Sequence, residues 1–191
     1  MTVYGSPSHI LYQLCLKDVY ESYYGTPKPG HFLQCMAHTC DEQAVLERTA
    51  YMLTLALAGY RRFCLGAGQL SMDEVFSPVM FVVDRGIARY ITKIVQGVDY
   101  VDDADAAVEA IAAGVAEGNF FMAEATLANM RQDFQSKLFP RTSLDAWRAA
   151  GSPTVRQKAK EEAQALIDSH DFRLPAAVQR DVDAVYAEAV R

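Results

Sequence analysis

Apolar side chains recur every four residues from Leu11 to Tyr23, close to the amino terminus. This spacing places them on one face of a helix. The preceding Ser6-Pro7 is typical of a helix start, because serine caps the first turn and proline fits its first position. The pattern therefore predicts a helix over residues 7–24.

Two short apolar runs, over residues 31–36 and 63–68, follow this helix. Their length and the glycine and proline residues beside them favour fully buried strands. Between the two runs, Asp41 is placed to cap a strongly apolar helix over residues 42–58. The order of helix, strand, helix and strand is typical of parallel strands joined by crossover helices, as in doubly wound sheets and (β/α)8 barrels.

The remainder of the chain has a helical pattern. Helices are predicted over 78–96, 103–117 and about 123–136, and later helix starts lie near Ser143, Pro153 and Pro175. Two strands cannot form a sheet that covers so many helices, so their edges must pair with other polypeptide or with copies of the chain. We therefore predict an α/β fold, predominantly helical with few parallel strands, that is part of a larger α/β barrel.

The segment 154–191 has apolar residues on one helical face and charged residues on the other. This pattern predicts a pair of helices that pack on the rest of the molecule, and docking to a partner is the alternative. No repeat, low-complexity stretch or linker divides the chain. We therefore treat it as a single unit.

Composition and charge exclude several classes of function. A chain of 191 residues with 51% hydrophobic content folds compactly. Its net charge of −6 and the lack of a run of Lys and Arg argue against nucleic acid or an anionic membrane as a partner. Since neither a signal peptide nor a membrane-spanning stretch is recognised, we expect a cytoplasmic protein that does not contact a membrane.

The densest polar cluster consists of His31, Cys35, His38 and Cys40, at or just after the first predicted strand, with Cys64 at the end of the second. Active sites of α/β barrels gather at such strand ends. Cys35, His38 and Cys40 are ligand types suited to zinc, which would activate a thiol or alcohol acceptor. Their spacing matches no standard structural zinc site. We therefore favour the alternative that the cysteines pack as small buried side chains.

Glycines and acids near these predicted strands allow two interpretations each. Gly66 and Gly68 bring backbone amides close to a ligand or simply form a turn. Asp41, Glu42 and Glu47 are interpreted as acids in the first turn of a helix, which its dipole favours, in preference to catalytic carboxylates.

Aromatic residues are concentrated in the first third of the chain, at Tyr4, Tyr12, Tyr20, Tyr23, Tyr24, Phe32, Tyr60 and Phe63. Aromatic faces bind quaternary ammonium groups by cation–π attraction, worth up to about 2 kcal/mol each when water is excluded. The interpretation that we favour is that the tyrosines pack on a neighbouring helix and keep their hydroxyls in water.

Several short stretches follow one another along the chain in a characteristic order: Gly5-Ser6-Pro7, Tyr23-Tyr24-Gly25-Thr26-Pro27, Asp41-Glu42-Gln43-Ala44, Leu57-Ala58-Gly59, Gly66-Ala67-Gly68-Gln69-Leu70, Phe76-Ser77-Pro78, Val83-Asp84-Arg85, Gly118-Asn119-Phe120-Phe121 and Leu174-Pro175. Together they resemble the trimethylamine methyltransferase (MttB-like) family of corrinoid-dependent methyltransferases. The resemblance spans essentially the whole chain.

The resemblance implies the carboxy-terminal part of a TIM (β/α)8 barrel that is more than twice as long as this chain. We expect one domain over 1–191, with a partial barrel over 1–140 and a helical extension over 141–191. Members of the family transfer a methyl group from a tertiary or quaternary amine to the cobalt of a separate corrinoid protein. Some carry pyrrolysine near the segment matching 30–40, where this chain has ordinary residues, which implies the branch without pyrrolysine.

The resemblance also implies where the methyl donor binds. We expect a small methylated amine, such as trimethylamine or a betaine, at His31, Cys35, His38, Cys64 and Gly66. The corrinoid (cobalamin) would be carried by a partner protein, and no metal held by this chain is expected. The histidines that the family commonly has near residues 119 and 125 are replaced here by Asn119 and Ala125, so no catalytic residue is assigned.

Three functions are therefore open. The leading hypothesis is an amine methyltransferase. The alternative is a non-catalytic remnant or assembly subunit, completed by another chain or by a homo-oligomer. A further alternative is a zinc-dependent thiol or alcohol methyltransferase.

Overall fold

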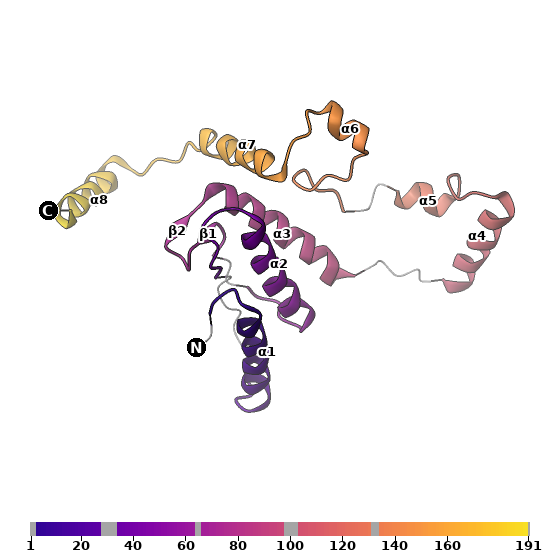
Figure 1. Cartoon of the computed structure of the whole chain (residues 1–191), viewed down its shortest axis with the longest axis horizontal. Helices are drawn as coiled ribbons and strands as arrows, with labels where there is room; N and C mark the ends of the chain where they lie inside the picture. Colours follow the sequence, from indigo (N-terminus) through magenta and orange to yellow (C-terminus); the bar gives the residue numbers. More distant parts are fainter. Residues whose placement is uncertain (1–2, 28–33, 64–65, 98–102, 131–133, 191) are drawn as a thin grey trace.

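The protein is described here by a computed structural model, which covers residues 3–27, 34–63, 66–97, 103–130 and 134–190. These residues are predominantly helical (Figure 1). Their elements are α1 (Pro7–Ser22), α2 (Glu42–Leu57), β1 (Gln69–Leu70), β2 (Val75–Phe76), α3 (Pro78–Gln96), α4 (Ala104–Glu117), α5 (Glu124–Asn129), α6 (Leu144–Ala149), α7 (Val155–Asp168) and α8 (Ala176–Ala189).

The predicted helix starts are confirmed, because short polar side chains cap the first turns. The hydroxyl of Ser6 accepts a hydrogen bond from the backbone N–H of His9 at the start of α1. The carboxylate of Asp41 accepts from two backbone N–H groups at the start of α2. Each cap satisfies donors that have no partner inside the helix, which is worth about 1 kcal/mol.

The strands differ from the prediction. Residues 34–36 are not in a strand, and the rest of the expected strand 31–36 lies outside the described residues. Of the expected strand 63–68, residues 64 and 65 lie outside them too. The two strands that are described, β1 and β2, form an antiparallel pair of two residues each. Because a parallel ladder needs a neighbouring strand, an extended segment without one is not part of a sheet.

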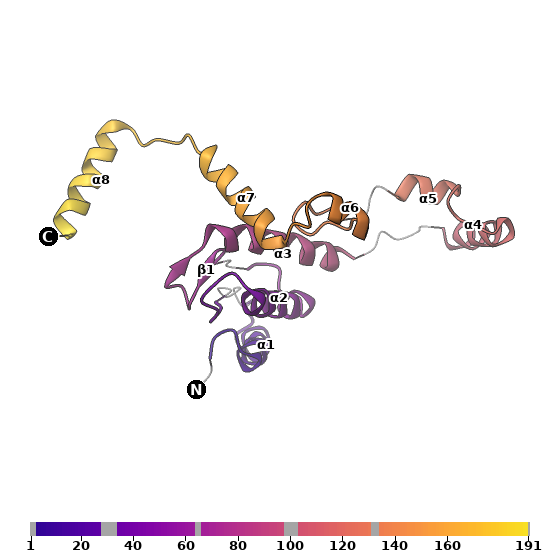
Figure 2. The same ribbon diagram turned by 45° about the horizontal axis from the view of Figure 1, so that its top comes forward.

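Four helices and the segments beside them form the packed part of the molecule. Figure 2 shows α7, α3, α2 and α1 following one another in this order, and contacts join each neighbouring pair. Apolar residues of α2, α3 and α7 are buried between them: Ala44, Met52, Leu55, Met80, Val83, Ile87, Ile91, Ala159 and Ala163. The candidate site lies beside β1 and β2, at the starts of α3 and α7.

The remaining helices extend away from this stack (Figure 1). The helix expected over about 123–136 is shorter, since α5 covers only Glu124–Asn129. The expected packing of the segment 154–191 is confirmed for α7, whose Ala159 and Ala163 are buried. It is wrong for α8, which buries no residue because the connection before it carries the helix beyond α3 and α7. Among the described residues, no helix is both long and apolar enough to span a membrane.

Candidate functional site

The segment 34–40 includes the end of the first predicted strand, and it meets residues 69–72, which follow the second predicted strand. The backbone N–H of Ser71 donates to the carbonyl of Ala37 at 2.9 Å, and that of Met72 donates to the carbonyl of Cys35 at 2.9 Å. The buried thiol of Cys35 lies 3.9 Å from the carbonyl oxygen of Gln69. The segment 34–40 therefore lies along the turn between β1 and β2.

The turn itself is strained. Ser71, Met72 and Asp73 have φ values of 51°, 55° and 77°, in the left-handed region that residues with a side chain avoid. Such conformations cost about 1–3 kcal/mol each and persist only where the surroundings hold them. Here His38 Nδ1 lies 2.7 Å from the hydroxyl of Ser71, and the amide of Gln34 donates to the carboxylate of Asp73 at 3.0 Å. Side chains of the segment 34–40 thus hold the turn.

A buried ion pair supports the turn from the helices. Arg48 on α2 and Asp84 on α3 are each 1% exposed, and Arg48 Nε lies 3.8 Å from Asp84 Oδ1. The guanidinium also donates to the carbonyl of Gln69, and the other carboxylate oxygen accepts from the N–H of Gly68 at 2.8 Å. We call these four residues the clamp, because they join α2 and α3 to the start of β1.

The clamp is incompletely paired. Within the described residues, Nε and Nη1 of Arg48 and Oδ1 of Asp84 have no hydrogen-bond partner. Burial raises the pKa of Asp84 above its ordinary value, although the charge of Arg48 and the N–H of Gly68 oppose this shift. Sequence reasoning missed the clamp. The signal was present, since a charged residue interrupts the apolar face of each helix at position 48 and position 84.

Glu47 has a different role from the one predicted. The structure confirms Asp41 as the cap and Glu42 as a first-turn acid of α2. Glu47 lies one turn further on, where its carboxylate accepts from the backbone N–H of Met36 at 2.8 Å and from the side-chain amide of Gln43 at 2.7 Å. It therefore attaches the segment 34–40 to α2, a contact between residues distant in sequence that periodicity does not reveal.

Cys35 and Cys40 are poor nucleophiles where they lie. Burial raises the pKa of the Cys35 thiol, and the nearby guanidinium of Arg48 opposes this only partly. Burial likewise raises the pKa of Cys40, against the opposing charge of Arg156. Both side chains therefore stay protonated near neutral pH, which fits the interpretation of Cys35 as a small buried side chain.

The positions of the candidate ligands do not support the zinc alternative. In the part of the chain that the structure describes, no group of three His, Cys, Asp or Glu side chains gathers as metal ligands do. Cys35 faces Gln69, whereas His38 is exposed and contacts Ser71. The further candidate ligand, Cys40, lines a pocket beside α7 that His38 also borders.

The predicted site residues separate into three groups. Cys35, His38 and Gly66 all lie around the turn 66–73, and a Cβ at Gly66 would collide with the side chain of Gln69. Cys40 lines an adjacent pocket. His31 and Cys64 lie outside the described residues.

That adjacent pocket has a volume of about 340 Å³. Its lining combines polar and apolar side chains from the segment 34–40, the two strands, and the starts of α3 and α7, namely His38, Thr39, Cys40, Leu70, Val75, Ser77, Val79, Arg156 and Lys160. It is large enough for a small methylated amine, and too small for a corrinoid ring.

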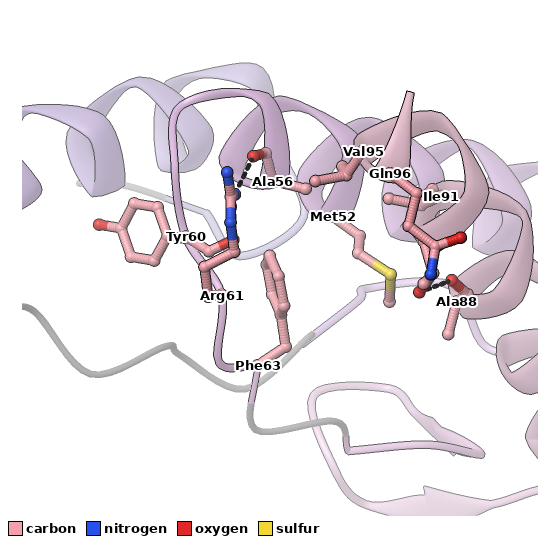
Figure 3. A pocket seen from close by; sticks show the side chains of 10 residues that line it. Met52, Ala56, Tyr60, Arg61, Phe63, Ala88, Ile91, Val95 and Gln96 are labelled. Carbon is pink, nitrogen blue, oxygen red and sulfur yellow. Dashed lines mark hydrogen bonds between the residues drawn. The ribbon is translucent and has the colours of Figure 1, made fainter. Parts of the chain in front are cut away.

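A second pocket, of about 500 Å³, lies between the carboxy-terminal ends of α2 and α3 (Figure 3). Two of the predicted aromatic residues, Tyr60 and Phe63, face it beside Met52. The hydroxyl of Tyr60 donates to the carbonyl of Gln13, and burial raises the pKa of Tyr60 to about 12. Tyr60 and Phe63 pack between helices, as the favoured interpretation expects, but the hydroxyl of Tyr60 is buried and not kept in water.

The tyrosines of α1 contradict that interpretation. Tyr12, Tyr20 and Tyr23 recur along the helix but are 57%, 37% and 81% exposed. They do not pack on a neighbouring helix, because α1 turns its buried side chains His9 and Gln13 toward α2.

The fold and the turn define a predominantly helical protein with a small pocket, and comparison with known proteins gives its family. The family model described as trimethylamine methyltransferase (MTTB) matches residues 3–188. The chain belongs to the trimethylamine methyltransferase family. This confirms the resemblance drawn from the sequence.

The relatives found are substantially longer than this chain. Trimethylamine methyltransferase MttB of Desulfitobacterium hafniense is 35% identical over 130 residues, which are 68% of this chain and 26% of the relative. MttB2 of Methanosarcina mazei is 31% identical over 88% of this chain and 34% of the relative. MttB of Methanosarcina barkeri is 32% identical over 87% and 34%. The chain thus spans about a quarter to a third of the length of these relatives.

Proposed function

We propose that this chain supplies part of a corrinoid-dependent methyltransferase, which moves a methyl group from a tertiary or quaternary amine to a corrinoid protein. The observation that carries the proposal is the family match over residues 3–188, together with relatives that are named trimethylamine methyltransferases. The partner protein would bring the corrinoid. This arrangement agrees with the size of the pocket at the turn, which has room for the amine alone.

We further propose that the chain is the carboxy-terminal part of a (β/α)8 barrel. Its predominantly helical content and the family match support this. In a complete barrel, the strands that the helices cover would come from the polypeptide outside this chain. The turn 66–73 would then lie where loops of the barrel surround the donor.

The residues around the turn would bind and orient the donor. His38 and Ser71 present polar groups at the rim, while Leu70, Val75 and Val79 exclude water from one side of the pocket. The clamp would fix the rim against α2 and α3. A docked corrinoid protein would supply the acceptor for the methyl group, and the residues of this chain would hold the methyl carbon in position.

A chimera tests the proposal. This chain replaces the matched segment of the Desulfitobacterium hafniense relative, and formation of methylated corrinoid is followed by absorbance with trimethylamine and with betaines. We expect transfer from at least one donor, reduced about tenfold or more by His38→Ala, with Thr92→Ala on an outer turn of α3 as the control. A folded chimera that transfers from none of these donors would contradict the proposal.

The alternative is a non-catalytic remnant or assembly subunit of such an enzyme. The short span of the chain relative to its relatives favours it. An inactive chimera that still assembles would support this alternative. The zinc-dependent thiol or alcohol methyltransferase draws no support from the ligand geometry of Cys35, His38 and Cys40. One equivalent of zinc in protein purified without chelator would restore it.

A further inference from the structure

Helix α1 is only partly covered by its neighbour α2. Its buried residues are His9 and Gln13, which face α2, where Gln13 Nε2 lies 3.0 Å from His9 Nε2 and the Gln13 carbonyl accepts from Tyr60. The apolar Ile10 and Leu14 are partly buried against the core, whereas further apolar residues of the helix are exposed. A helix with apolar residues beyond the side that its neighbour covers is normally enclosed by further protein.

Four exposed apolar residues of α1 and its C-cap Tyr23 form one stripe, which we call the outward face: Tyr12, Leu16, Val19, Tyr20 and Tyr23. The spacing of four, three, one and three residues places all five side chains on one side of the helix. They are between 37% and 81% exposed. Figure 2 shows α1 at the edge of the stack, with α2 on one side of it.

The whole chain also exposes more surface than a compact monomer does. The chain exposes 14089 Å². A compact monomer of 21.1 kDa exposes about 9,000 Å² by the usual scaling with mass. The excess of about 5,000 Å² includes the helices that extend away from the stack as well as α1.

We propose that the outward face of α1 is a docking surface for the part of the family's polypeptide that this chain does not span. About two thirds to three quarters of each relative lies outside the matched segment, which is enough polypeptide to cover the face. A second copy would bring only the same helices. It would supply neither the missing strands nor a different surface. The proposal rests on the proposed barrel part and is independent of methyl transfer.

Co-expression tests the proposal. The full chain is tagged and produced together with the portion of the Desulfitobacterium hafniense relative outside the matched segment. The molar mass of the purified material is then measured by light scattering. We expect a complex with one copy of each polypeptide, and slower hydrogen exchange in α1 than in the chain alone. If the partner precipitates when it is produced alone, its recovery in solution only together with this chain would also indicate a complex.

Matched variants locate the contact. The double substitution Leu16→Asp and Val19→Asp should weaken the complex by about tenfold or more, since it places two charges in the contact. Leu166→Asp is the control, because Leu166 is 44% exposed on α7, on the far side of the stack. Circular dichroism of each variant alone checks that the helices remain.

Three results would overturn the proposal: a chain that forms only homodimers through α1, a partner that precipitates even with the chain, or a complex that the double substitution leaves intact. None of these measurements uses a methyl donor. An inactive chimera together with an intact complex would therefore reject the proposed function and keep this inference.

Discussion

At the scale of single residues, the clamp is the feature on which the site depends most. Arg48 and Asp84 are both 1% exposed, and each also hydrogen-bonds the backbone at the start of β1. A buried ion pair contributes little net stability, because removing two charges from water offsets their attraction. Removing one partner is different, since the remaining charge is then buried without compensation.

We therefore expect Asp84→Ala to lower the free energy of unfolding by about 3–5 kcal/mol in urea denaturation. Arg85→Ala is the control, because its ion pair with Glu162 is about half exposed and should change stability by less than about 1 kcal/mol. Equal losses of unfolding free energy from the two substitutions would show that breaking the buried pair costs no more than breaking an exposed one.

The raised pKa of Asp84 predicts a pH dependence. Because the folded state binds this proton more tightly than the unfolded chain, the contribution of Asp84 to stability falls as pH rises from the ordinary carboxyl range through the raised value. The side chain introduced by Asp84→Asn cannot ionise, so this variant does not lose stability in the same way as pH rises. Denaturation of both proteins across acidic to neutral pH should therefore show the wild type losing stability relative to the variant as pH rises. A constant difference would contradict the shift.

At the scale of elements, local signals were reliable and non-local ones were not. Helix starts at Ser6, Asp41 and Ser77 depend on one side chain and the next turn, so the sequence alone reveals them. The pairing of Cys35 and Ala37 with the turn, and the contact of Glu47 with Met36, join residues that are distant in sequence. Periodicity therefore indicated the two segments of the site, but not the contacts that bring them together.

The helix α8 gives a test at this scale. Its stripe of valines resembles that of a packed helix, yet none of its residues is buried. Removing residues 171–191 should therefore shift the thermal unfolding midpoint by less than about 2 °C. Ala163→Asp in α7, which buries a charge against α3, should lower the midpoint markedly more. A large shift on removal of α8 would mean that it packs in solution.

At the scale of the whole molecule, the chain would supply only part of the enclosure of the proposed donor site. The turn, the segment 34–40 and the pocket beside them belong to one end of the stack, whereas much apolar surface of α1, α4 and α8 is exposed. Excluding water from a methylated amine requires walls on all sides.

We therefore expect the purified chain of 191 residues to give little or no methylated corrinoid from cob(I)alamin with trimethylamine or a betaine. The measurement is the absorbance of the corrinoid over time, with a complete relative as the positive control. Robust transfer by the chain alone would contradict this expectation, because it would show that the described walls suffice.

The clamp also has a consequence for sequence variation. Neither charge of the pair reaches water, so a mutation at position 48 or at position 84 leaves a cost that only a matching change at the other position removes. Across related sequences, these two positions should therefore be inherited as a unit: both keep their charges, or both lose them together.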